Sequence, residues 1–316
     1  MSRFKDIKLF AGSATPDLAA EISRFLDIPL SKTLIKRFSD GEIWVEIEEN
    51  VRQKDAYIIQ STCFPANENI MELLVLIDAL KRASVDTITA VIPYYGYARQ
   101  DRKAQPRVPI TAKLVADLLT AAGVARIVSV DLHAGQIQGF FNIPVDHLYS
   151  LPVFLDHLKD IGVAEDWVFV SPDTGGAERA RAYAKRFKSG IALVDKRRPK
   201  PNVSEIMNIV GEVEGRKCVL VDDIIDTAGT LTTAAKALMD NGAKSVMACC
   251  THAVLSGPAI ERVEASVLES LVVTSTIPLS QDAKKCKKIK VISVGNLLAR
   301  SILRIANGES VSSLFV

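Results

Sequence analysis

Two adjacent acids, Asp222 and Asp223, follow an apolar run at residues 218–221 and precede a short polar loop. An apolar run of this length is typical of a strand buried in a parallel sheet. From Leu231 onward, apolar residues recur with the spacing of a helix. The loop between the expected strand and helix consists of Asp226, Thr227, Ala228, Gly229 and Thr230.

This order of strand, small-residue loop and helix predicts a phosphate site. The first N–H groups of a helix have no partner within it, and the helix dipole places about half a positive charge there. Ala228 and Gly229 let an anion approach the backbone closely. The hydroxyls of Thr227 and Thr230 add two hydrogen-bond donors.

The two acids do not suit a phosphate, because carboxylates repel it. We therefore expect Asp222 and Asp223 to meet sugar hydroxyls or a hydrated Mg²⁺. The loop is not a Walker loop, since the chain contains no G-x-x-x-x-G-K-[ST] sequence. Spacing alone leaves open an ordinary turn in which Thr or Asp caps the helix.

The stretch VLVDDIIDTAGT, residues 219–230, resembles the phosphoribosyl-diphosphate signature of the type I phosphoribosyltransferase fold. Both have four aliphatic positions, two acids and a loop of Thr and Gly. Ala228 stands where many members of that fold have glycine, and its small side chain keeps the backbone accessible. The resemblance implies that the loop binds a ribose phosphate.

Polar residues also follow other expected strands, in both halves of the chain. They are Asp131 and His133 after Arg126–Val130, residues 171–176 after 168–170, and residues 195–198 after 191–194. Because ligands bind at the carboxyl ends of parallel strands, this pattern predicts one site that uses both halves. Asp131 and His133 are two apart, so an extended backbone would point them the same way.

Histidine at position 133 has two readings, a metal or phosphate contact and a structural residue. A single histidine beside an apolar run is more often structural. His147, His157 and His252 are read as structural.

Composition indicates a soluble globular protein with room for two domains. The chain has 316 residues, of which 48% are hydrophobic and 24% charged, and its net charge of +2 gives no sign of a nucleic-acid or membrane surface. Its five cysteines include no C-x-x-C pair, which favours a reducing, cytoplasmic setting without a structural metal. No apolar stretch is long enough for a secretion signal or a membrane span.

Strand and helix patterns alternate along the chain, which predicts an α/β fold with parallel sheets covered by helices. Residues 78–97 align weakly with residues 236–255, so we expect two similar domains. Their boundary is expected near residues 142–150. The expected domains are residues 1–146 and 147–316, each of the type I phosphoribosyltransferase fold.

A second resemblance covers the whole chain. DLHAGQIQGFFNIPVD, residues 131–146, is similar to the signature of class I ribose-phosphate pyrophosphokinases. FSDGE at 38–42 and YYGYARQDRK at 94–103 resemble that family's ATP-binding segments. SPDTGG at 171–176 resembles its pyrophosphate loop, and DKRRP at 195–199 its catalytic loop. The chain is therefore identified as a member of this family.

The resemblance assigns a role to each matched residue. ATP would contact Phe38, Asp40, Gly41, Glu42, Arg99 and Gln100. Ribose 5-phosphate would contact Arg198, Asp222, Asp223, Asp226, Thr227, Ala228, Gly229 and Thr230. Mg²⁺ would bind near His133, Asp173 and Asp131, and the catalytic residues would be Lys196 and Arg198.

The activity implied by the resemblance is diphosphoryl transfer from Mg-ATP to ribose 5-phosphate. The products are AMP and 5-phosphoribosyl 1-diphosphate, a precursor of purine, pyrimidine and NAD nucleotides, histidine and tryptophan. The family also implies a homo-oligomer, a hexamer, whose active sites are shared between subunits, and phosphate or ADP as effectors. Two alternatives stay open, a catalytically silent regulatory member of the family and a salvage phosphoribosyltransferase.

Overall fold

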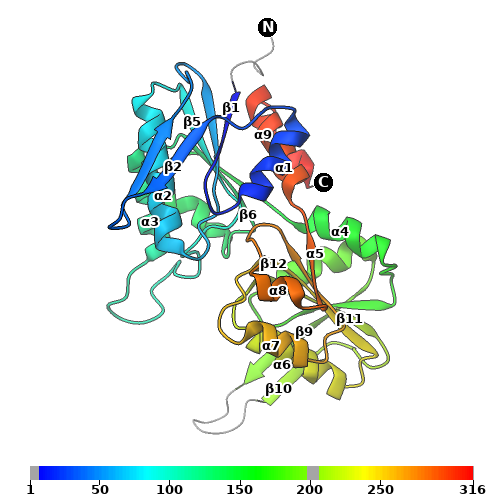
Figure 1. Ribbon diagram of the computed structural model, residues 1–316. Helices are drawn as coiled ribbons and strands as arrows, with labels where there is room; N and C mark the ends of the chain where they lie inside the picture. The colour runs from blue at the N-terminus through cyan, green and yellow to red at the C-terminus, as the bar shows by residue number, and fades with distance from the viewer. Residues whose placement is uncertain (1–6, 198–205, 316) are drawn as a thin grey trace. The chain divides into compact units, whose positions relative to one another are not determined.

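The structure is a computed structural model that describes residues 7–197 and 206–315. The chain divides into two compact units (Figure 1). The first comprises residues 1–149, 276–278 and 293–316, and the second comprises residues 150–275 and 279–292. Each unit contains a largely parallel sheet with helices on both faces, so the expected α/β class is confirmed.

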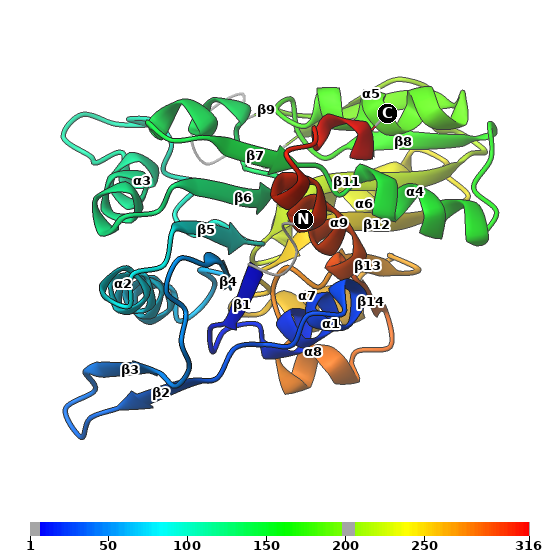
Figure 2. The same cartoon turned by 90° about the horizontal axis from the view of Figure 1, so that it is seen from above.

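The first unit is built on a five-stranded parallel sheet of order β1-β4-β5-β6-β7. Helices α2 and α3 cover one face, and α1 with α9 lies on the other (Figure 2). A two-stranded hairpin, β2–β3, stands apart from this sheet. The elements are β1 (Ile7–Ala11), α1 (Pro16–Leu26), β2 (Thr33–Arg37), β3 (Ile43–Ile47), β4 (Asp55–Ile59), α2 (Ala66–Arg82), β5 (Thr87–Ile92), α3 (Thr111–Ala122), β6 (Arg126–Val130), η2 (Gly135–Phe140), β7 (Val145–Leu148), α9 (Gly295–Asn307) and η3 (Ser312–Leu314).

The second unit is built on a seven-stranded sheet of order β10-β9-β8-β11-β12-β13-β14. All its neighbouring strands are parallel except β9 and β10, which pair antiparallel. The elements are α4 (Leu151–Asp160), β8 (Trp167–Ser171), α5 (Ala177–Phe187), β9 (Gly190–Arg197), β10 (Ile206–Val210), β11 (Lys217–Ile225), α6 (Gly229–Asp240), β12 (Ser245–Ala253), α7 (Ala259–Ala265), β13 (Leu271–Thr274), α8 (Gln281–Lys285) and β14 (Ile289–Ile292).

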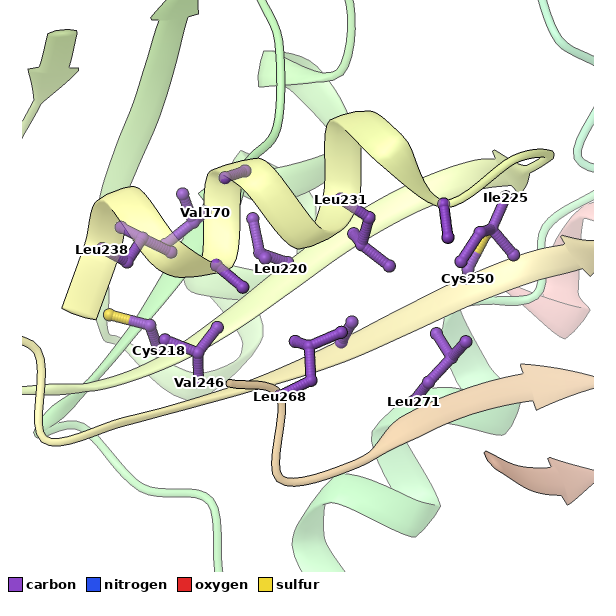
Figure 3. Close-up of a cluster of buried hydrophobic side chains, with 14 of the residues drawn as sticks. Val170, Cys218, Leu220, Ile225, Leu231, Leu238, Val246, Cys250, Leu268 and Leu271 are labelled. Carbon is purple, nitrogen blue, oxygen red and sulfur yellow. The ribbon is translucent and has the colours of Figure 1, made fainter. Parts of the chain in front are cut away.

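The apolar residues 218–221 of β11 are explained by burial on both faces of the sheet. Successive side chains of a strand point to opposite faces. Cys218 and Leu220 pack into a core cluster beneath α6, while Val219 and Val221 pack into a second cluster with α4 and α5. Figure 3 shows the first cluster, with α6 lying across the strands. Both faces are buried, as expected for a central parallel strand.

The C-terminal segment belongs to the first unit, which differs from the expected continuous second domain at 147–316. Helix α9 packs against α1, although the two are far apart in sequence. At the start of α9, Ser293 Oγ donates a 2.6 Å hydrogen bond to Glu21. The apolar face of α9, which includes Leu298 and Ile302, is buried. This burial against a distant helix explains why no local signal marks the return of the chain.

All five cysteines are buried free thiols. Within the described residues, no helix is both long and apolar enough to span a bilayer.

Candidate active site

The loop at residues 226–230 connects β11 to α6 in the second unit. Helix α6 begins at Gly229, and Ala228 is its N-cap residue. Alanine has no side-chain acceptor, so it leaves the first N–H groups of α6 to another partner. The alternative of an ordinary turn capped by Thr or Asp is therefore wrong, and the geometry suits an anion.

Ala228 adopts left-handed backbone angles, with φ 60° and ψ 0°. For a residue other than glycine this conformation costs about 1–2 kcal/mol. The Ala228 methyl group is almost fully buried and belongs to the same core cluster as Leu231. Burying one methyl group contributes about 0.8 kcal/mol, which offsets much of that cost. Packing thus explains why alanine is tolerated at this turn.

Asp222 and Asp223 lie inside β11, which continues to Ile225. The expectation that the strand ends at residue 221 is wrong, because the ladder with β12 includes Asp222 opposite Cys250 and extends to the end of both strands. The Asp222 carboxylate accepts the N–H of Asp223 at 2.8 Å. The acid pair is thus held on the rigid sheet, next to the loop.

Arg179, on α5, bridges the two acids. Its Nη1 lies 3.1 Å from Asp223 Oδ1 and 3.4 Å from Asp222 Oδ1. Burial raises the pKa of Asp222 above its ordinary value of 3.8, and the neighbouring Asp223 raises it further. Arg179 opposes this shift without cancelling it. Asp222 therefore keeps its proton near neutral pH in the protein without ligands, and a bound cation would stabilise its charged form.

Asp173 lies in the loop between β8 and α5. Its carboxylate accepts the N–H of Gly176 at 3.0 Å, and its carbonyl accepts the hydroxyl of Ser171 at 2.6 Å. A Cβ at Gly176 would lie 2.6 Å from Ser171 Oγ, so a larger residue here would displace the Ser171 hydroxyl from its bond to Asp173. Asp173 also contributes to the raised pKa of Asp222, which shows that the two carboxylates lie within electrostatic reach.

The two predicted catalytic residues belong to the DKRRP segment after the expected strand 191–194. Strand β9 extends further, to Arg197, because it pairs with β10; Lys196 stands opposite Met207 in this ladder. Arg198 lies outside the described residues. The backbone of Lys196 is thus placed on the same sheet as the acid pair.

In the first unit, Asp131 and His133 follow β6. The expected extended backbone is wrong at this point, because Asp131 has a φ of 39°. Asp131 is buried, while His133 is exposed. The N–H of Leu132, between them, donates a 2.9 Å hydrogen bond to His147 Nε2 on β7. His147 therefore has the expected structural role, since it fixes the segment that carries both predicted ligands.

The segment 38–42 forms the tip of the β2–β3 hairpin. Phe38 N–H donates to the carbonyl of Glu42 at 2.8 Å, and Gly41 closes the turn with a φ of 94°. The Asp40 carboxylate accepts the N–H of Glu42 at 3.1 Å. The ring of Phe38 is 53% exposed and meets Trp44 edge to face. An exposed aromatic on a rigid turn is suited to stacking against a planar base.

Arg99 and Gln100 follow β5 and are both exposed. The carbonyl of Gln100 accepts the N–H of Ala112 at 3.2 Å, and its side-chain oxygen accepts the hydroxyl of Thr111 at 2.6 Å. The start of α3 thereby fixes Gln100. The structure thus places the predicted ribose-phosphate residues from 222 to 230 together in the second unit, and the predicted ATP residues on two segments of the first.

The donor sets fit Mg²⁺. In the described part of the chain, no three histidine, cysteine or acidic side chains gather into a ready metal cage. Mg²⁺ does not require one, because it keeps several waters and binds through one or two carboxylates and the phosphates of a substrate. The pair at 222 and 223 supplies such oxygens, as does the exposed Asp173.

Two arginines that contact the site were not found from the sequence. Arg179 reaches the acids across 43 residues, and Arg262 reaches the carbonyl of Thr227 across 35 residues. Neither lies in a motif. A contact between segments this far apart leaves no local pattern in a single sequence.

The fold and the loop define a protein of the phosphoribosyltransferase type, with the expected sugar-phosphate loop at the carboxyl edge of a parallel sheet. Two family profiles match the chain. One, described as the N-terminal domain of ribose phosphate pyrophosphokinase, matches residues 7–123, and the other, the phosphoribosyl synthetase-associated domain, matches residues 196–316. The chain belongs to the ribose-phosphate pyrophosphokinase family.

Relatives matched over their full length support the same family assignment. The chain is 55% identical to the ribose-phosphate pyrophosphokinase of Fusobacterium nucleatum over all of both chains. It is 57% identical to that of Bacillus subtilis over 98% of each. The crystal structure of phosphoribosylpyrophosphate synthetase from Mycobacterium smegmatis matches with a TM-score of 0.91 at 42% identity, over 96% of this chain and 99% of that one. The expected fold of two phosphoribosyltransferase-type domains is thereby confirmed.

Proposed function

We propose that this enzyme transfers the diphosphate group of ATP to the anomeric hydroxyl of ribose 5-phosphate, giving 5-phosphoribosyl 1-diphosphate and AMP. The observation that carries the proposal is the acid pair of β11 beside an anion loop, in a chain that matches ribose-phosphate pyrophosphokinases from end to end. A salvage phosphoribosyltransferase is not favoured, because the family match includes both units. A silent family member is not favoured either, since Lys196, Arg198, Asp173 and His133 are all retained.

The second unit would bind the sugar. The N–H groups at the start of α6 and the hydroxyls of Thr227 and Thr230 would hold the 5-phosphate. Asp222 and Asp223, which Arg179 bridges, would form hydrogen bonds with the ribose hydroxyls. The sheet fixes the acids and the helix fixes the loop, so the two ends of the sugar are positioned independently.

The first unit would bind ATP. Adenine would stack on the exposed ring of Phe38, and the turn formed by Asp40, Gly41 and Glu42 would contact its edge. Arg99 and Gln100 would add polar contacts.

Transfer requires that negative charge on the moving group be stabilised. Lys196 and Arg198 would supply positive charge to it, because both are basic residues and they stand in the sequence at the end of β9 and directly after it. Mg²⁺, when bound near Asp173, His133 and Asp131, would offset the charge of the phosphate oxygens.

The proposal also covers the oligomeric state, the cellular location and the regulation of the enzyme. A hairpin tip with an exposed aromatic pair is suited to complete the adenine pocket of another subunit, so we propose a homo-oligomer, a hexamer, with shared active sites. We also propose a cytoplasmic location and regulation by phosphate or ADP. The product would feed the synthesis of nucleotides, histidine and tryptophan.

A coupled assay for AMP tests the proposal. ATP and Mg²⁺ are supplied with and without ribose 5-phosphate. We expect AMP only in the presence of the sugar. AMP formation at the same rate without ribose 5-phosphate, or none with it, would reject the proposal.

A further inference from the structure

Arg262, on α7, lies against the sugar-phosphate loop. Its Nη1 donates a 2.9 Å hydrogen bond to the carbonyl of Thr227. A Cβ placed on Gly229 would meet the same nitrogen at 3.3 Å. The guanidinium therefore lies beside the two residues that flank Ala228, the N-cap of α6.

The segment before Arg262 is hydrogen-bonded to the same loop. The turn after β12 donates two backbone hydrogen bonds, from Leu255 to the carbonyl of Ile225 at 3.1 Å and from Ser256 to that of Asp226 at 3.0 Å. The hydroxyl of Ser256 also bonds to the Asp226 carboxylate. Val263, next to Arg262, is fully buried in the core cluster beneath α6. The position of Arg262 beside the loop is thus fixed by several contacts on both sides of it in sequence.

A phosphate bound at this loop needs more positive charge than the loop itself supplies, and Arg262 can provide it. A sugar phosphate carries about 1.5 to 2 negative charges at pH 7. Two carboxylates, those of Asp223 and Asp226, lie on or beside the loop and repel it. The helix dipole supplies only about half a positive charge. The Thr227 carbonyl takes one of the five N–H donors of a guanidinium, which leaves a full charge and further donors beside the loop.

We propose that Arg262 is a binding residue for the 5-phosphate, acting through its charge as well as through its bond to Thr227. This inference rests on the proposed function, because it assigns the loop to ribose 5-phosphate. An arginine that only supports the loop would act through the hydrogen bond alone. Charge and hydrogen bond can be separated by substitution.

The test compares Arg262→Gln, which keeps a donor and loses the charge, with Arg262→Lys, which keeps the charge. We expect Arg262→Gln to raise the KM for ribose 5-phosphate about tenfold. We expect Arg262→Lys to stay within about threefold of the parent, and kcat and the KM for ATP to change by less than about twofold in both. Raising ionic strength should increase the KM of the parent more than that of Arg262→Gln, since salt screens an exposed charge.

Arg216→Gln is the matched control. Arg216 is also exposed and also donates to a backbone carbonyl, that of Asp166 at 3.5 Å, but it lies at the amino end of the same sheet. We expect no change in either KM. Equal KM values for ribose 5-phosphate in the parent and Arg262→Gln would overturn the inference. An equal increase in this KM in Arg262→Gln and Arg262→Lys would overturn it as well. If the parent itself makes no AMP with ribose 5-phosphate, the proposed function fails instead.

Discussion

Replacing Asp222 with asparagine should stabilise the protein while it removes activity. Asparagine has the same shape and can still accept the N–H of Asp223, which lies 2.8 Å from Asp222 Oδ1. It cannot carry the negative charge. Burial, together with repulsion from Asp223, raises the pKa of Asp222 from 3.8 to about 8, so the charged form is unfavourable in the folded protein without ligands.

The effect depends on pH in a defined direction. Folded Asp222 keeps its proton up to about pH 8, whereas the unfolded chain loses it near pH 3.8. Between these values the folded state binds more protons, so the stability that neutral Asp222 contributes declines as pH rises and is lost above about pH 8. Asparagine stays neutral throughout. The advantage of Asp222→Asn should therefore grow from about pH 4 to about pH 8.

The size of the effect follows from the same shift. One pKa unit corresponds to about 1.4 kcal/mol. Because 23% of the Asp222 side chain is exposed and water screens its charge, we count only about one to two pKa units of the shift. They correspond to about 1.4–3 kcal/mol in the free energy of unfolding. This corresponds to an increase of about 3–12 °C in the Tm of the unit that contains β11.

Thermal unfolding at pH 5 and pH 8.5, without metal or sugar, measures the difference. Asp240→Asn is the control, because Asp240 is exposed and pairs with Lys236 at 2.7 Å on the surface of α6. We expect a change of at most about 2 °C for this variant, equal at both pH values. An Asp222→Asn protein that is less stable than the parent at pH 8.5, or equally stabilised at both pH values, would refute the reasoning. Its AMP-forming activity should fall at least about 100-fold.

Four further outcomes are expected. Lys196→Ala should lower kcat by about 10³ or more with a much smaller change in the KM for ribose 5-phosphate, measured by steady-state kinetics, because its charge acts mainly in the transition state. Gly229→Val should raise the KM for ribose 5-phosphate but not that for ATP, since its side chain crowds the backbone and Arg262. A chelator should abolish activity, and His133→Ala should raise the Mg²⁺ concentration that titration shows is required. Mixed oligomers of Phe38→Ala and Lys196→Ala should regain up to about a quarter of the parent activity, if each site draws on two chains.

For each of these predictions, a specific outcome would contradict it. A kcat within about fivefold of the parent would remove Lys196 from the mechanism. An equal increase in the KM for ribose 5-phosphate and for ATP in Gly229→Val would mean that the sugar phosphate binds elsewhere. Activity in excess chelator would exclude a metal requirement. No recovery after confirmed subunit exchange would mean that one chain supplies both Phe38 and Lys196 to a site.

Periodicity and turn residues predicted much of the fold correctly. The strands expected at Ile7–Ala11, Thr87–Ile92 and Arg126–Val130 have these bounds in the structure. These strands are largely apolar, and their signal is local. The hairpin strand β2 was not predicted, because it is half exposed and its sequence, TLIKR, ends in two charged residues. Strand β10 was missed as well, since its pairing with β9 depends on a partner rather than on its own pattern.

The candidate site was predicted only where its residues are adjacent in sequence. The loop from Asp226 to Thr230 could be recognised because strand, loop and helix follow one another. The ionisation of Asp222 could not, because it depends on burial and on Arg179, 43 residues away. Arg262 was missed for the same reason. Residues that bring charge to a site from other elements become visible only in three dimensions.

The most direct measurement follows the γ-phosphate of ATP. With ATP labelled at that position, we predict that the label moves to the sugar product together with the unlabelled β-phosphate, and that AMP appears in equal amount. Label in a sugar product that has gained only one phosphate, with ADP as the other product, would show an ordinary kinase and would contradict diphosphoryl transfer.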